Sequence, residues 1–196
     1  MKTYSTTDII KILGEKQISF FTLADFGRLF EVNNQQTLYK RIQALEKQGI
    51  IQKLIKGKYR FVLTPTDDFT TANFLYGPSY VSLESALSFY GIITGFTYQI
   101  TSITIKGTRS FSVNNKDFSF SQITNSLFWG YEKKDSFLIA DREKALLDYV
   151  YFSIKGLRHL DWEEIDISEI NKQKLVACLA RFKNKQIDDC LKRIIL

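Results

Sequence analysis

The stretch that decides the fold runs from Phe20 to Val62 and reads FFTLADFGRLFEVNNQQTLYKRIQALEKQGIIQKLIKGKYRFV. Thr22 is a residue type that commonly caps the start of a helix. Apolar residues then recur at helical spacing, at Leu23, Phe26 and Phe30. The pattern predicts a short helix that begins after Thr22 and ends before the polar residues 31–34.

A second helix is predicted over residues 35–48, with Gly49 as its stop. Its apolar residues are spaced i, i+4 and i+7, which places them on one face: Leu38, Ile42 and Leu45. Two runs rich in β-branched and aromatic residues then flank Lys56-Gly57-Lys58, which indicates a hairpin with glycine where φ is positive. Ser5 or Thr6 can cap a supporting helix over residues 7–15. This order of elements predicts a winged helix-turn-helix.

The face of the second helix opposite its apolar side is predicted to bind DNA. At about 100° per residue this face carries glutamine and lysine and no acid. Gln can pair with the adenine edge in the major groove, and Lys can reach guanine or a phosphate. The candidate DNA contacts on the helix are Gln36, Thr37, Tyr39, Lys40, Arg41, Gln43 and Lys47, and those on the hairpin are Lys56, Lys58 and Arg60. The alternative is an ordinary solvated helix face.

The distribution of charge supports a polyanionic partner. The chain has 196 residues and a net charge of +6. Residues 1–66 contain eleven Lys or Arg and five Asp or Glu, and the other 130 residues hold sixteen of each sign. The whole positive excess therefore belongs to the predicted winged helix, as expected for a segment that binds nucleic acid.

Composition limits the class of protein. Apolar residues make up 44% and charged residues 24% of the chain, which is typical of a folded globular protein. No apolar run approaches the ~18 residues that a membrane span needs, and the N-terminus lacks a signal-peptide core. We therefore expect a cytoplasmic protein with no membrane partner. Cys178 and Cys190 are expected to be reduced thiols.

The polar stretch Leu63–Asp68, which contains Pro65, predicts a domain boundary near Thr66. The predicted fold class is α+β, with the winged helix over residues 1–66 followed by a mixed α/β domain with a helical tail over residues 67–196. In the second domain we predict helices over 70–76, 82–91 and 141–154, and strands over 98–106, 109–113, 118–121, 126–132 and 137–139. The tail is predicted to start helically at residues 161–164. Its two amphipathic helices would bury Leu175, Val176, Leu179 and Phe182, then Ile187, Leu191, Ile194 and Ile195.

Two segments of the second domain resemble a known family. They read YVSLESAL over residues 80–87, with Gly91 after it, and IADREKALLD over residues 139–148. Together with the winged helix they resemble the AbiEi-type antitoxins, transcriptional regulators of abortive-infection, type IV toxin–antitoxin systems. This chain has Tyr90 where many members of that family have histidine.

The resemblance implies two activities. The winged helix would repress its own operon by binding double-stranded DNA at the promoter, and repressors of this kind commonly occupy paired sites as dimers. The second domain would counteract a toxin of nucleotidyltransferase type, either by contact or by opposing the toxin's chemistry. No cofactor and no metal are implied.

The residues of the second segment have their own physical interpretation. Asp141 suits a helix N-cap, and Glu143 lies in the first turn, where an acid is favourable. Lys144 and Asp148 are spaced as i, i+4 partners and are expected on the outer side of the helix. The segment is either a well-capped core helix or part of a surface related to the toxin.

Few residues suggest catalysis. His159 is the single histidine, and there is no phosphate-binding glycine loop or zinc-ligand pattern. The one enzymatic candidate is Asp117 with Glu132 and Lys134, a spacing that magnesium-dependent nucleases use. We expect no catalytic activity. The alternatives are a nuclease targeted by the winged helix and a plain regulator whose second domain senses a ligand.

Overall fold

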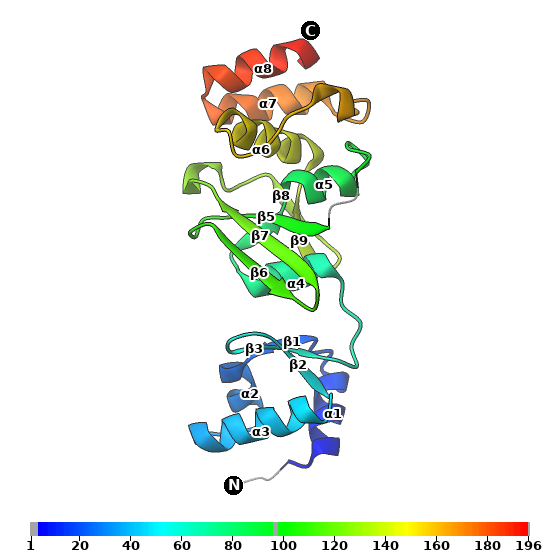
Figure 1. The fold of residues 1–196 in the computed structure, drawn as a ribbon, viewed down its shortest axis with the longest axis vertical. Helices are drawn as coiled ribbons and strands as arrows, with labels where there is room; N and C mark the ends of the chain where they lie inside the picture. The colour runs from blue at the N-terminus through cyan, green and yellow to red at the C-terminus, as the bar shows by residue number, and fades with distance from the viewer. Residues whose placement is uncertain (1–3, 96–97, 196) are drawn as a thin grey trace. The chain divides into compact units, whose positions relative to one another are not determined.

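The structure is a computed structural model that describes residues 4–95 and 98–195, without the side chains of residues 193–195. Within these residues the chain is an α+β protein with eight α-helices, a three-stranded antiparallel sheet and a six-stranded mixed sheet (Figure 1). It divides into two compact units, Met1–Asp67 (unit 1) and Asp68–Leu196 (unit 2). No helix in the described part of the chain is long and apolar enough to cross a membrane.

Unit 1 contains α1 (Thr6–Glu15), β1 (Phe20–Thr22), α2 (Leu23–Leu29), α3 (Gln35–Lys47), β2 (Ile51–Ile55) and β3 (Lys58–Phe61). The three predicted helices and the hairpin are confirmed, and Gly57 has a φ of 78° at the turn. Strand β1 was not predicted. It pairs antiparallel with β3, which lies between β1 and β2 in the sheet.

Local hydrogen bonds fix where the helices of unit 1 begin. Ser5 and Asp8 form a capping box at α1, and Thr22 and Asp25 form another at α2. The side chain of Asn34 caps α3 by accepting the N–H of Thr37 at 3.0 Å. The predicted inward residues of α3, Leu38, Ile42 and Leu45, are buried against residues from the other elements of unit 1, among them Ile9, Leu13, Phe26, Phe30, Ile51 and Phe61.

Unit 2 begins with α4 (Asp68–Leu75), β4 (Ser79–Val81), α5 (Leu83–Phe89), β5 (Gln99–Thr104), β6 (Arg109–Val113) and β7 (Lys116–Gln122). After these come β8 (Tyr131–Lys134), β9 (Phe137–Ala140), α6 (Arg142–Ile154), α7 (Lys172–Phe182) and α8 (Lys185–Ile195). The strand order is β6-β7-β5-β4-β9-β8. Strands β4 and β9 are parallel, as are β5 and β7, and the other neighbours are antiparallel.

The predicted strand over residues 126–132 is wrong in its first half. Residues Asn125–Leu127 form a 3₁₀ turn, and β8 starts only at Tyr131. The N–H of Leu127 bonds to the carbonyl of Thr124 at 2.9 Å, a local bond that takes the place of a ladder bond.

Helix α6 lies between the sheet and the pair of helices α7 and α8, as Figure 1 shows. This agrees with the prediction of a central helix, since most of its residues are buried. Residues Trp162–Glu164 form a 3₁₀ turn. Helix α7 buries Leu175, Leu179 and Phe182, but Val176 is 46% exposed because it lies about 100° away from that stripe. In α8, Ile187 and Leu191 are buried, and the side chains of Ile194 and Ile195 lie outside the described residues.

Candidate functional site

The outer face of α3 is open to solvent. Six of its predicted DNA contacts are exposed: Gln36, Thr37, Tyr39, Lys40, Gln43 and Lys47. These side chains project from a helix whose opposite side is held in the core by Leu38, Ile42 and Leu45. The face is therefore held on a packed element and remains available to a partner.

Two of the predicted contacts, Arg41 and Arg60, have hydrogen-bond partners within the chain. The guanidinium of Arg41 donates to the backbone carbonyl of Tyr4 at 2.7 Å, which ties the N-terminal segment to α3. Arg60 donates from Nη1 to the hydroxyl of Thr66 at 3.3 Å and is half-buried. On the hairpin, Lys56 is exposed and Lys58 is half-buried.

A groove of about 670 Å³ separates α3 from the hairpin. Tyr39, Gln43 and Glu46 line its helix side, and Lys53 and Lys56 line its hairpin side. Glu46 is an acid beside the predicted contact face, for which no acid is predicted. Burial and the Glu46 charge raise the pKa of Tyr59 at the base of the groove. The groove therefore carries both signs of charge and an aromatic wall.

In unit 2 the two family-like segments meet in a buried polar network. Asp148 Oδ2 accepts hydrogen bonds from Tyr80 Oη at 3.0 Å and from Ser82 Oγ at 2.9 Å. Lys144 Nζ donates to Tyr80 Oη at 2.9 Å and forms an ion pair with Asp148. The prediction that Lys144 and Asp148 lie on the outer side of α6 is wrong, because both side chains are completely buried. Helix α5 and strand β9 pack against α6, as do α7 and α8 of the tail, and the Tyr80 side chain reaches the pair from β4.

Aromatic rings enclose the Lys144 ammonium. Its Nζ lies 5.3, 5.2 and 5.3 Å from the ring centroids of Tyr80, Trp129 and Phe182. Gly130, at a φ of 73°, lies so close that an added Cβ would come within 2.9 Å of Lys144 Cγ. Burial lowers the pKa of Lys144 and raises the pKa of Asp148, since each charge is removed from water.

The predicted cap Asp141, and Ser82 at the start of α5, bind partners other than their own helices. Ser82 and Asp141 stand at the N-cap positions of α5 and α6, but neither side chain makes the capping bond. Ser82 donates to Asp148, and Asp141 pairs with Lys174 at 3.2 Å. Tertiary partners therefore take the side chains that local spacing assigns to the caps.

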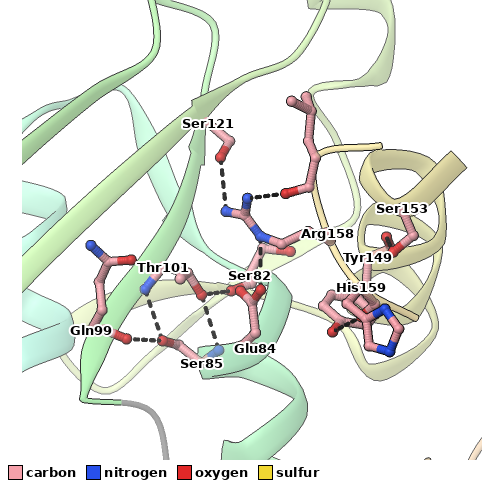
Figure 2. A network of polar contacts seen from close by, with 11 residues as sticks. Ser82, Glu84, Ser85, Gln99, Thr101, Ser121, Tyr149, Ser153, Arg158 and His159 are labelled. Atoms are coloured by element: carbon pink, nitrogen blue, oxygen red, sulfur yellow. Dashed lines mark hydrogen bonds and ion pairs between the residues drawn. The ribbon is translucent and has the colours of Figure 1, made fainter. Parts of the chain in front are cut away.

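A second polar cluster fixes the connection after α6 (Figure 2). Arg158 pairs with Glu84 at 2.7 Å and donates to Ser121 at 3.3 Å. Beside it, Thr101 Oγ1 donates to the carbonyl of Ser82 at 2.7 Å. His159 is exposed, and its carbonyl accepts from the Tyr149 hydroxyl at 2.6 Å. Local spacing does not predict these contacts, because Glu84 and Arg158 are far apart in the chain.

The three residues of the nuclease candidate do not converge. Asp117 lies on β7, whereas Glu132 and Lys134 lie on β8, and three strands separate β7 from β8 in the sheet. At about 4.8 Å between neighbouring strands, the backbones are roughly 19 Å apart. Among the described residues, no group of three or more His, Cys, Asp or Glu side chains could hold a metal ion.

Glu132 and Lys134 instead line a charged pocket of about 410 Å³ at the start of α6. Lys174 lies 3.2 Å from Asp141 and 3.1 Å from Glu143, and Arg142 lies 3.8 Å from Glu169. Burial, with the charges of Glu132 and Asp141, raises the pKa of Tyr90 to about 12. Most charges in the pocket are thus compensated by neighbours.

Neither a scan against protein-family models nor a search of the curated proteins finds a match for this chain.

Proposed function

We propose that this protein is a DNA-binding transcriptional autorepressor and the antitoxin of a toxin–antitoxin system. In this proposal unit 1 is a winged helix-turn-helix, with α3 as the recognition helix and the β2–β3 hairpin as the wing. The observation that carries the proposal is the exposed face of α3, where Gln36, Lys40, Gln43 and Lys47 stand clear of the core.

The charges of unit 1 support a duplex as the partner. Lys40 and Lys47 lie on the open face of α3, and Lys56 lies at the hairpin turn. Lysines so placed can contact phosphates on both sides of a major groove, and glutamines between them can reach base edges. Arg41 and Arg60 each use one guanidinium donor within the chain, to Tyr4 and to Thr66.

The antitoxin role of unit 2 is supported by the resemblance of its two segments to the AbiEi-type antitoxins. In that role unit 2 counteracts a toxin of nucleotidyltransferase type. The segments meet at Tyr80, Ser82, Lys144 and Asp148, where the side chains are buried and bind one another. Their part in the proposal is to join α6 to Tyr80 and Ser82, so the residues that counteract the toxin, by contact or by opposing its chemistry, lie elsewhere in unit 2.

Co-expression tests this role. The full chain is produced together with the neighbouring open reading frame, which encodes the proposed toxin. We expect the full chain to restore growth that the neighbouring gene product arrests. Absence of rescue, with both proteins present in the cell, would contradict the antitoxin role. Magnesium-dependent DNA cleavage that is lost in Glu132→Gln would revive the nuclease alternative.

A regulator with a sensing domain is the second candidate function. The charged pocket at the start of α6 favours it, since polar groups from β8, α6 and α7 converge there. Repression of the promoter without rescue of growth would select this candidate. A change in DNA affinity on Lys134→Glu, a pocket residue in unit 2, would support it further.

A further inference from the structure

One stripe of α3 combines two amides with an aromatic ring. Gln36, Tyr39 and Gln43 are spaced i, i+3 and i+7, so their side chains follow one another along the helix. All three are exposed, and 42% of the Tyr39 surface is open to solvent. Within the described residues neither glutamine amide makes a hydrogen bond. The stripe therefore presents two amide groups, one on each side of an exposed aromatic ring, for hydrogen bonds to a partner.

The groove beside this stripe is not a uniformly cationic phosphate site. Tyr39 and Gln43 face Lys53 and Lys56 across it, and Glu46 lines it as well. A carboxylate repels phosphate oxygens, whereas amide and aromatic groups suit base edges. Glu46 has no ion-pair partner among the residues that the structure describes, although two lysines line the same groove. The Glu46 carboxylate would therefore repel a phosphate on the Tyr39 side of the groove.

We propose that this stripe selects A·T base pairs in the major groove, with Tyr39 packed against the C5-methyl group of thymine. Gln36 and Gln43 would each donate to N7 and accept from N6 of an adenine. The inference rests on the proposed DNA-binding function and adds the base that the site selects. Thymine is the base that presents a methyl group in this groove, and adenine presents the acceptor and donor pair that an amide matches.

The test uses the full chain and synthetic duplexes. Selection from a random duplex pool gives the bound sequence, and each thymine in it is then replaced by deoxyuridine, which lacks only the methyl group. We expect an A·T-rich core. At one or two thymines of this core, each replacement should weaken binding about fourfold, which corresponds to the free energy of burying one methyl group. Tyr39→Ala should weaken binding to the thymine duplex and abolish the difference between thymine and deoxyuridine.

Tyr98→Ala is the matched control, because Tyr98 is a tyrosine 95% exposed on unit 2. It should leave both the affinity and the effect of deoxyuridine unchanged. Specific binding to a G·C core, or binding that ignores deoxyuridine at every position, would overturn the inference and leave the proposed function standing. Failure to bind any duplex would overturn both.

Discussion

Lys144 and Asp148, one helical turn apart on α6, form an ion pair in which neither side chain is exposed to solvent. The hydroxyl groups of Tyr80 and Ser82 also donate hydrogen bonds to the Asp148 carboxylate. Removing two charges from water costs several kcal/mol per ion, and the pair offsets that cost only with its hydrogen bonds in place. The network joins α6 to Tyr80 on β4 and to Ser82 at the start of α5.

Replacing one residue of the Lys144–Asp148 pair should lower the free energy of unfolding more than replacing both. Lys144→Ala leaves the Asp148 carboxylate buried without a counter-ion, and we expect a loss of about 3–5 kcal/mol in the free energy of unfolding. The double variant Lys144→Met, Asp148→Leu should recover most of this loss. Urea unfolding measures both.

The exposed ion pair of Asp189 and Lys192 on α8 supplies the control. Asp189→Ala should leave the unfolding midpoint unchanged. Equal losses in the single and double variants of the buried pair would contradict the account, and so would a single variant as stable as the wild type.

The capping box of α2 should make stability depend on pH in the acid range. Hydrogen bonds from the Thr22 hydroxyl and N–H lower the pKa of Asp25. The unfolded chain then takes up the proton at a higher pH, so the stabilisation is present above the ordinary pKa of about 3.9 and is lost as pH falls through the folded pKa. Asp25→Asn should cost about 0.5 kcal/mol near pH 7 and progressively less in acid.

Unfolding of wild type and Asp25→Asn across this range measures the difference. Glu31→Gln, which changes an exposed acid outside a capping box, is the matched control. A difference between wild type and Asp25→Asn that grows as pH falls would have the wrong sign for a lowered pKa.

A single charge reversal on the α3 face should sharply weaken DNA binding. Lys40→Glu removes a cation from the exposed face and places a carboxylate against the duplex, so affinity should fall at least tenfold. Fluorescence anisotropy with a promoter duplex measures it. Lys16→Glu changes the charge equally on an exposed residue at the end of α1, away from this face, and should have a smaller effect. Equal losses of affinity in Lys40→Glu and Lys16→Glu would mean that DNA binding depends only on net charge.

The connection between β3 and α4 should be the first site of proteolysis. Leu63 is 62% exposed and lies in a stretch without a helix or strand. A brief chymotrypsin digest of Tyr98→Ala, which removes a cleavage site that is 95% exposed, should cut there and give two stable fragments, identified by mass spectrometry. Leu157 is 57% exposed, but the Arg158 contacts hold its segment, so cleavage there should be slower. First cleavage at Leu157 would contradict this assignment of the linker.

Local spacing made the helices of unit 1 predictable. Leu38, Ile42 and Leu45 define the buried side of α3 by themselves, and the exposed side follows from them. Strand β1 could not be predicted in this way, because Phe20–Thr22 becomes a strand only by pairing with β3, some forty residues later.

The same difference applies to the candidate sites: some of their features follow from local spacing, and others depend on tertiary contacts. Exposure of Gln36, Lys40, Gln43 and Lys47 follows from periodicity within one helix. The i, i+4 spacing of Lys144 and Asp148 is the same for an exposed pair and a buried one. Residues outside the helix, among them Tyr80, Trp129 and Phe182, decide that this pair is buried. The partners of Arg41 and Arg60 likewise come from tertiary contacts.

Equilibrium binding of the full chain to a duplex that covers its own promoter tests the central claim most directly. The comparison is a scrambled duplex of equal length, titrated between about 50 and about 200 mM salt. We expect the promoter duplex to bind at least a thousandfold more tightly, with log affinity falling linearly against log salt. Equal affinity for the two duplexes, or an affinity that does not change with salt, would contradict the assignment of unit 1 as a sequence-specific DNA-binding domain.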